Sequence, residues 1–200
     1  REGITGIKYI SFMNIRVAHE KKGCAEKILP FLKDGESIYN TLLVSKPGAG
    51  KTTCLRDCIR SLSNGKEGWE GMKICVVDER SEIAACHLGI PQNDMGIRTD
   101  VLSGCGKSEG MMLMLRSMSP QIIAVDELGG KKDFQAVEQA ACSGVRILGT
   151  VHADTVEELW EKPYLKKWMK RGIFERFILI RHNRSGERDF QVFNGKREQL

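Results

Sequence analysis

The sequence predicts an α/β fold with a mostly parallel sheet and helices on both of its faces. Short, continuous apolar runs at residues 41–44, 73–77 and 121–125 have the length and composition of strands that are buried on both faces. Segments with helical spacing alternate with these runs. Strands that alternate with helices form parallel sheets whose faces the helices cover.

Length and charge set broad limits on the function. Two hundred residues suffice for one well-buried domain. The chain carries 31 Lys and Arg against 26 Asp and Glu, and this net charge of +5 is spread along the whole length. Such a mildly basic chain is compatible with an anionic ligand, a membrane surface or nucleic acid, and it selects none of them.

The seven cysteines indicate a reducing compartment. They show no CxxC spacing, no paired pattern and no Cys/His cluster of the kind that holds zinc. We therefore expect them to be small, buried apolar residues of a cytoplasmic protein. No apolar stretch approaches the ~20 residues that a membrane-spanning helix needs, so we expect no direct span and only peripheral association with a membrane.

Local periodicity predicts the other elements. Residues 4–17 alternate loosely, which predicts one or two strands, residues 25–32 have helical spacing, and a turn follows at residues 34–35. Residues 51–62 are expected to be helical, and residues 85–106 mostly a long loop, because Pro91 and four glycines interrupt any period. Further on we expect helices at 109–118 and 133–142, a strand at 145–150, a helix in two pieces at 156–169, and a hairpin at 176–181 and 189–193.

A glycine-rich segment carries the strongest functional signal. It consists of Ser45, Lys46, Pro47, Gly48, Ala49, Gly50, Lys51 and Thr52, followed by Thr53, and it fits the phosphate-binding P-loop pattern except that Ser replaces the first Gly. An apolar strand precedes the segment and a helix follows it. A chance Gly-Lys-Thr in a surface turn is therefore the weaker interpretation.

The residue types of this segment suit a nucleotide. Gly48 and Gly50 let backbone N–H groups turn inward onto phosphates, and the positive end of the following helix points at them. Lys51 would reach the β- and γ-phosphates, and the Thr52 hydroxyl would bind Mg²⁺. The sequence thus predicts ATP and Mg²⁺ as cofactors.

Two carboxylates follow the apolar strand at 121–125. Asp126 and Glu127 lie at the edge where open α/β sheets bind their ligands. Asp126 would hold Mg²⁺ through water, and Glu127 would orient or deprotonate the attacking water. Alone, such a pair is more often a solvated strand end, but its combination with the P-loop favours a catalytic role.

A further acidic cluster follows the strand at 73–77. In it, Asp78 could bind metal, and Glu79 and Glu82 could position water. We expect this strand to be inserted between the P-loop strand and the strand at 121–125, as in the NTPases with a catalytic glutamate, among them RecA-like and AAA-type motors. The alternative is a charged helix start, where carboxylates in the first turn are favourable.

Polar groups also end the strand at 145–150. Thr150 and His152 lie there, and His152 could act in catalysis by sensing the γ-phosphate. A lone histidine is more often structural. Polar groups at four strand ends are nevertheless the pattern expected of a functional site.

In chain order the four signatures are the P-loop, the acidic cluster at 78–82, the segment 115–127 that ends in Asp126 and Glu127, and the strand end with Thr150 and His152. In this order they resemble the signatures of the secretion ATPases of type II and type IV systems. Residues 77–83, 89–94 (Gly-Ile-Pro-Gln-Asn-Asp), 96–102 and 116–120 resemble more closely the stage III sporulation protein AA family of endospore-forming bacteria. The resemblance runs from about residue 14 to about residue 181. Asp126 departs from the broader secretion ATPases, which often have Gly at that position.

The resemblance implies a RecA-like P-loop ATPase core of the secretion type. It implies a homo-oligomeric ring, a hexamer, in the mother cell, at the base of a membrane channel complex to the forespore whose membrane proteins would be its partners. Residues 1–36 would be the remnant of a truncated N-terminal region, and residues 37–200 the ATPase core with a C-terminal helix and hairpin. Arg16 matches the segment where secretion ATPases place an arginine that reaches a nucleotide, with a surface-strand arginine as the equal alternative.

Two other functions compete with a ring-forming ATPase. A RecA-like nucleic-acid translocase needs a basic groove with aromatics, and residues 162–176, with Tyr164 and Trp168, offer that mixture. A solvated amphipathic helix accounts better for this segment, so nucleic acid is not the expected partner. The third hypothesis is a nucleotide-gated scaffold that binds ATP and barely turns it over.

Overall fold

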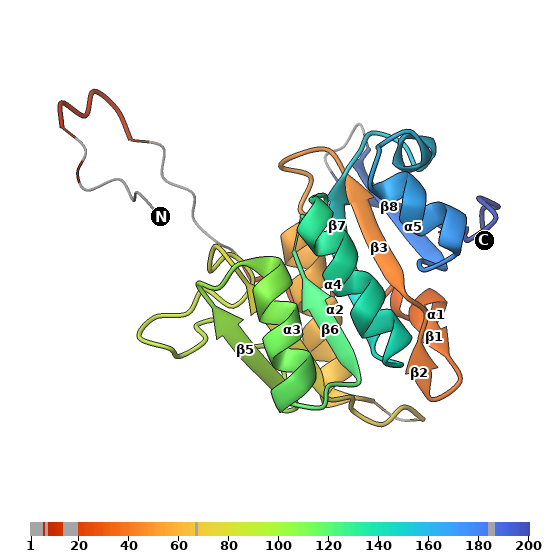
Figure 1. The fold of residues 1–200 in the computed structure, drawn as a ribbon, viewed down its shortest axis with the longest axis horizontal. Coiled ribbons are helices and arrows are strands. Elements are labelled where there is room, and N and C mark those ends of the chain that lie inside the picture. The colour runs from red at the N-terminus through yellow and green to blue at the C-terminus, as the bar shows by residue number, and fades with distance from the viewer. Residues whose placement is uncertain (1–5, 7, 14–19, 67, 184–186) are drawn as a thin grey trace.

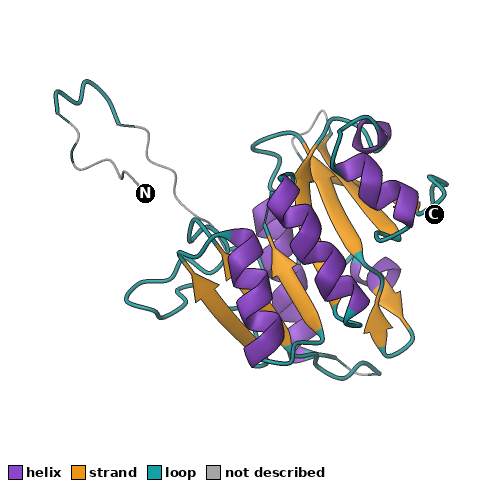
Figure 2. Cartoon of the chain, viewed as in Figure 1, coloured by secondary structure: helices purple, strands orange, loops and turns teal. Residues whose placement is uncertain are grey.

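In the computed structural model a seven-stranded sheet lies at the centre of the molecule, with helices on both faces (Figures 1 and 2). The structure describes residues 6, 8–13, 20–66, 68–183 and 187–200. The strands are β3 (Thr41–Ser45), β4 (Ile74–Asp78), β5 (Thr99–Ser103), β6 (Ile122–Val125), β7 (Arg146–His152), β8 (Arg176–His182) and β9 (Arg188–Asn194). Their order is β5-β4-β6-β7-β3-β8-β9, and every neighbouring pair is parallel except β8 and β9. The predicted α/β fold with a mostly parallel sheet is therefore confirmed.

The helices form one layer on each face of the sheet. The short α1 (Leu29–Leu32) and α2 (Lys51–Asn64) pack on one face, and α3 (Lys107–Ser117), α4 (Lys131–Cys142), the 3₁₀ helix η1 (Glu157–Trp160) and α5 (Leu165–Arg171) pack on the other. Figure 1 shows α3 and α4 side by side in front of the sheet with α2 behind it. A two-stranded hairpin, β1 (Lys33–Asp34) and β2 (Ser37–Ile38), follows α1. Within the described residues no helix is long and apolar enough to cross a membrane.

The central strands are buried on both sides. Leu42 and Ile123 enter the core beneath α3, α4 and α5, whereas Leu43 and Ile122 enter the core beneath α2. Successive side chains of a strand point to opposite faces, so a strand covered on both faces must be apolar without interruption. For this reason the short apolar runs in the sequence predict β3, β4 and β6 correctly.

The strand order contradicts one prediction. The strand inserted between β3 and β6 is β7, which pairs with both of them, and β4 lies beyond β6. The chain leaves β3 through α2 and crosses the back of the sheet before it enters β4, so neighbours in sequence are not neighbours in the sheet. The inserted strand is consequently the one that carries Thr150 and His152.

The loop predicted at residues 85–106 contains the edge strand β5. This strand pairs with β4 on one side, and all five of its residues are only partly buried. An edge strand of this kind tolerates polar residues such as Thr99 and Asp100. Its sequence therefore lacks the continuous apolar run that marks the inner strands.

The N-terminal segment also departs from its prediction. Gly6 and residues 8–13 form neither helix nor strand, and the rest of the strand predicted at 4–17 lies outside the described residues. The helical spacing at 25–32 produces turns and then the four-residue α1. Pro30 is favoured in the first turn of a helix, so the helix begins at Leu29 rather than at residue 25. Ala25 and Ile28 still pack into the same core as α2.

All seven cysteines are free thiols, but not all are buried. Cys54, Cys58 and Cys75 are buried as predicted, whereas Cys142 is exposed. Cys142 is the last residue of α4, beyond the helical face that packs on the sheet through Val137 and Ala140.

Candidate nucleotide-binding site

The loop between β3 and α2 has the backbone of an anion cradle. Gly48 has φ 78° and Gly50 φ 87°, in the left-handed region that glycine adopts without steric cost. Gly50 is also the residue that precedes α2, and no side chain of the described residues caps this helix. Its first N–H groups therefore face the loop, which is the arrangement that binds phosphate at helix starts.

Lys51 is held inside this loop. Its side chain is 5 % exposed, and Nζ lies 3.4 Å from Ser45 Oγ and 3.5 Å from the carbonyl oxygens of Ser45 and Lys46. It also lies 2.9 Å from Nδ1 of His152. These partners are neutral, so a phosphate oxygen would be a stronger, charge-assisted acceptor for the ammonium.

Thr52 and Asp126 are in direct contact. The Thr52 hydroxyl donates to Oδ2 of Asp126 at 3.0 Å, and the Thr150 hydroxyl donates to Oδ1. Mg²⁺ is usually bound by one or two protein groups, several waters and substrate phosphates. The described residues include no group of three or more His, Cys, Asp or Glu that would hold a metal by itself. This oxygen pair fits a magnesium ion that arrives with a nucleotide.

Glu127 adopts a rare backbone conformation. Its φ is 42°, which is uncommon for a residue other than glycine. Its N–H donates to the Thr150 hydroxyl at 2.6 Å, and its carboxylate is contacted by His152 at 2.8 Å and by Arg80 at 3.3 Å. Such conformations persist where the surroundings impose them, and they cluster at active sites.

The charges around Glu127 favour its ionised form. Burial raises the pKa of this carboxyl, but the hydrogen bond from His152 and the positive charges of Arg80 and Lys51 act in the opposite direction. Their sum lowers the pKa of Glu127 from its ordinary value.

His152 bridges the lysine of the P-loop and this glutamate. Its Nδ1 faces Nζ of Lys51 at 2.9 Å, and its Nε2 faces Oε1 of Glu127 at 2.8 Å. An ammonium group has donors only, so Nδ1 accepts, and Nε2 carries the proton that it donates to the carboxylate. The contacts thus specify a neutral imidazole with its proton on Nε2.

Asp78 is engaged by its own turn. It is 2 % exposed, and its carboxylate accepts the backbone N–H groups of Glu82, Ile83 and Ala84 at 2.8–3.1 Å. This geometry is that of a residue that anchors the segment after β4. It differs from the predicted role of Asp78 as a metal ligand.

The two glutamates of the acidic cluster lie near the catalytic candidate. Glu79 pairs with Lys107 at the start of α3, at 2.9 Å. Glu79 and Glu82 line one small pocket together with Asp126 and Glu127. The structure therefore brings the acidic cluster and the strand end at β6 to the same place, as their positions after parallel strands suggested.

The remaining P-loop residues frame the cradle. Ser45 ends β3 with its hydroxyl directed to the Lys46 carbonyl at 2.8 Å, and the side chain of Lys46 pairs with Asp154 at 2.8 Å on the surface. Lys46, Pro47, Gly48 and Ala49 line a hollow with residues 154–155 and 179–182. The Thr53 carbonyl accepts the Cys24 thiol at 3.7 Å. Arg16, the predicted nucleotide-contacting arginine, lies outside the described residues.

Two functional candidates are absent from the sequence prediction. Arg80 contacts Glu127, and Arg188, from the start of β9, lies over Gly50 of the P-loop. Arg80 adjoins the acidic cluster in the sequence, so its position could have marked it as a candidate site residue. Arg188 comes from a hairpin far along the chain, and no motif marks it.

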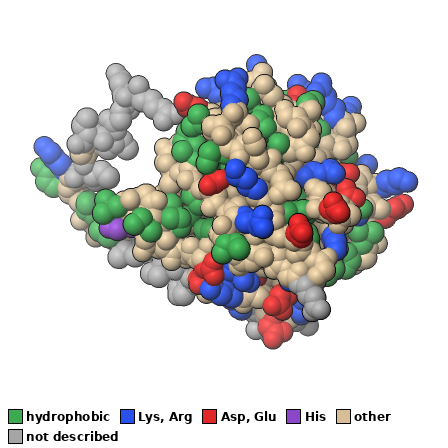
Figure 3. Space-filling view, turned by 90° about the horizontal axis from the view of Figure 1, so that it is seen from below, with side chains coloured by type: hydrophobic (Ala, Val, Ile, Leu, Met, Phe, Trp, Pro, Cys, Tyr) green, Lys and Arg blue, Asp and Glu red, His purple; other side chains and the backbone are tan. Residues whose placement is uncertain are grey.

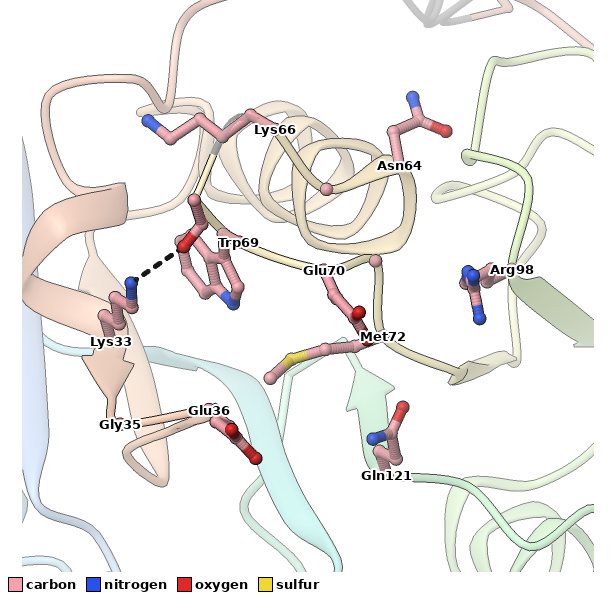
Figure 4. A pocket seen from close by; sticks show the side chains of 13 residues that line it. Lys33, Gly35, Glu36, Asn64, Lys66, Trp69, Glu70, Met72, Arg98 and Gln121 are labelled. Atoms are coloured by element: carbon pink, nitrogen blue, oxygen red, sulfur yellow. Dashed lines mark hydrogen bonds between the residues drawn. The ribbon is translucent and has the colours of Figure 1, made fainter.

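Size alone would place the ligand at the wrong edge of the sheet. A hollow of about 850 Å³ lies at the opposite edge, with Lys33, Trp69, Arg98 and Gln121 in its lining (Figure 4). The hollow beside the P-loop is smaller, about 610 Å³. Figure 3 views the molecule from below, and acidic and basic side chains are interspersed over that face. Parallel sheets bind ligands outside the carboxyl ends of their strands, where the P-loop lies. We therefore assign the site to the P-loop edge.

The fold and the loop between β3 and α2 define an α/β domain of the P-loop type. The profile of the family described as "Sporulation stage III, protein AA" matches residues 1–200. The chain is 43 % identical over 176 residues to stage III sporulation protein AA of Bacillus subtilis (strain 168). The chain belongs to the sporulation stage III protein AA family. The alignment covers 88 % of this chain and 57 % of the Bacillus subtilis protein, so the chain spans little more than half the length of that relative.

Solved structures of motor and secretion proteins share the fold. The Legionella pneumophila ATPase DotB matches with a TM-score of 0.65 and 16 % identity, over 89 % of this chain and 52 % of that one. The pilus retraction motor PilT, solved with bound ADP, matches with a TM-score of 0.60 and 17 % identity, over 88 % of this chain and 52 % of that one. At these sequence identities, the comparison shows that the proteins share a fold.

Proposed function

We propose that this chain binds ATP with Mg²⁺ at the P-loop edge and hydrolyses it. The observation that carries the proposal is the convergence of five residues in one network of direct contacts: Lys51 and Thr52 from α2, Asp126 and Glu127 from the segment after β6, and His152 from β7. Lys51 and the N–H groups of the loop would hold the phosphates, and Thr52 and Asp126 would hold Mg²⁺. The ion would neutralise charge on the phosphates.

Glu127 would orient the attacking water more than it would take up its proton. A lowered pKa makes a carboxylate a weaker base but keeps it ionised and able to accept a hydrogen bond from water. His152 fixes one oxygen of this carboxylate through its Nε2–H. When a phosphate binds Lys51, the ammonium would leave Nδ1 of His152. Because the same imidazole contacts Glu127 through Nε2, this change would couple phosphate binding to the carboxylate.

Two substitutions test the site. We expect Lys51→Ala to abolish measurable ATP binding in calorimetry, because the ammonium is the principal charge in the loop. We expect Glu127→Gln to bind ATP but to hydrolyse it roughly 10²-fold more slowly, the usual size of a lost acid–base group. Lys196→Ala, at an exposed position near the C-terminus, serves as the control for a lost charge. If both site variants hydrolyse ATP at the parent rate, the assignment is wrong.

We further propose that the domain works in sporulation as a subunit of a hexameric ring, in the mother-cell cytoplasm and peripheral to the membrane. Its partners would be membrane proteins of a channel to the forespore. Membership of the sporulation family and the shared fold with DotB and PilT support this proposal. The division between an N-terminal region at 1–36 and a core at 37–200 belongs to the same proposal, as does a nucleotide contact from Arg16.

Oligomeric state tests the ring. We expect light scattering after size exclusion to show a larger assembly with a non-hydrolysable ATP analogue than without it. A monomer under both conditions at high concentration would contradict the ring for this chain and favour a nucleotide-gated scaffold.

A further inference from the structure

The C-terminal hairpin places a guanidinium on the P-loop. A Cβ atom added to Gly50 would lie 2.6 Å from Nη2 of Arg188 and 2.9 Å from its Cζ and Nε. Arg188 is the first residue of β9, the edge strand that pairs only with β8 in the sheet. Its side chain therefore reaches back across the sheet edge to the peptide that starts α2.

This placement brings like charges together. The guanidinium adjoins the N-terminus of α2, which carries partial positive charge, and it lies against Gly50, the residue before Lys51. Nη1 of Arg188 is fully buried and has no hydrogen-bond partner among the described residues. A buried donor without a partner costs free energy, and so does its proximity to a positive helix end. An anion bound between these groups would offset both costs.

The surroundings of Arg188 indicate which part of a nucleotide it meets. It borders a pocket with Lys21, Lys27, His182 and one acidic residue, Glu187. It also lies beside Cys24, whose thiol donates to the Thr53 carbonyl. Arg188 lies against Gly50, and the backbone N–H groups of a P-loop at this point cradle the α- and β-phosphates. The phosphates nearest to it are those that ADP and ATP share.

We propose that Arg188 is a nucleotide-binding residue supplied by the same chain, which donates to the α- or β-phosphate and ties the β8–β9 hairpin to the P-loop. The proposal rests on the function proposed above. It gives Gly50 a second role besides its left-handed φ, because any side chain there would displace the guanidinium.

Calorimetry with ATP and with ADP tests the proposal. Arg188→Met keeps the apolar stem of the side chain. We expect it to lower the affinity for ATP and for ADP to the same extent, by roughly tenfold, the size of one charge-assisted hydrogen bond. Arg188→Lys should restore part of the affinity. The matched control is Lys196→Met, which removes an exposed charge close to the end of β9 and should change neither affinity.

Thermal unfolding separates binding from a structural role. Because Nη1 lacks a partner and faces like charge, we expect Arg188→Met without nucleotide to melt no lower than the parent, while the stabilisation by added ADP shrinks. A lower melting temperature without nucleotide would overturn the proposal, as would unchanged affinity for ATP and ADP. A parent chain that binds no nucleotide would refute the proposed function itself. If the parent binds, Lys51→Ala does not, and Arg188→Met binds normally, only the role of Arg188 fails.

Discussion

His152 joins two groups with opposite tasks, the lysine that would grip phosphate and the glutamate that would orient water. We expect His152→Ala to lower kcat for ATP hydrolysis by about 10- to 100-fold, because Glu127 loses the donor that fixes its carboxylate. KM for ATP should change much less, because Lys51 keeps its place in the loop. Steady-state kinetics measure both values.

Arg80→Ala is the matched variant for this prediction. Arg80 contacts the other oxygen of Glu127 at 3.3 Å, but 65 % of its side chain is exposed, so solvent screens the pair. We expect its effect on kcat to be smaller than that of His152→Ala. The reverse order would contradict the role given to His152.

The lowered pKa of Glu127 predicts how stability depends on pH. A carboxyl whose pKa is lower in the folded state stabilises that state above its unfolded pKa, which is near 4.5, and the contribution is lost as the pH falls through the folded pKa. We expect the parent to melt about 1–3 °C above Glu127→Gln at pH 7, a small difference because the carboxylate is partly exposed. The difference should vanish as the pH falls below 4.5 and through the folded pKa. A constant difference from pH 3 to 7, in calorimetric scans, would contradict the linkage.

Single residues were predictable where a local pattern marks them. The segment Ser45–Thr52 and the pair Asp126 and Glu127 each follow an apolar strand, so residue type and position sufficed to place them at one edge. The turn-anchoring contacts of Asp78 depend on how the chain folds back after β4, and sequence cannot show this. Arg188 owes its place to strand pairing of a distant hairpin.

Among the elements, inner strands and long helices were predictable, whereas edges and strand order were not. β3, β4 and β6 are apolar because helices cover both of their faces. The edge strand β5 lacks that constraint, and the four-residue α1 is too short for periodicity to define. The position of β7 between β3 and β6 depends on the path of α2 across the sheet.

The packing of α3 on β4 predicts an unusual effect of alanine in a helix. A Cβ at Gly110 would lie 2.5 Å from Cγ1 of Val77, a buried β-branched residue with little rotamer freedom. Alanine normally stabilises a helix by up to about 1 kcal/mol relative to glycine, but overpacking costs typically about 1–3 kcal/mol. We expect Gly110→Ala to lower the free energy of unfolding by about 1–2 kcal/mol in urea titrations.

Gly195→Ala is the control for this substitution. Its new methyl group would meet its nearest neighbours at 3.7 Å, an ordinary contact. Gly195→Ala should change the free energy of unfolding by no more than about 0.5 kcal/mol. A Gly110→Ala protein as stable as the parent would show that α3 lies farther from β4 than described.

For the whole molecule, the aromatic cluster under α5 bears on the nucleic-acid alternative. Trp168 is fully buried, stacked on Phe134 with ring centroids 5.7 Å apart and edge-on to Phe174. It is therefore not available to stack on bases, although Lys166 and Lys167 beside it are exposed. We expect single-stranded DNA to leave the rate of ATP hydrolysis unchanged, even at low salt. Stimulation by DNA that disappears with added salt would favour a translocase.

The contact between Lys51 and His152 also bears on how quickly a nucleotide enters. The Lys51 ammonium is covered, and its donors point to the loop and the imidazole, so an arriving nucleotide does not meet it directly at the first encounter. Lys51 must leave these partners after the first encounter, and this first-order step would make the observed association rate level off at high ATP concentration. Entry would then be governed by a rearrangement inside the loop and depend little on ionic strength.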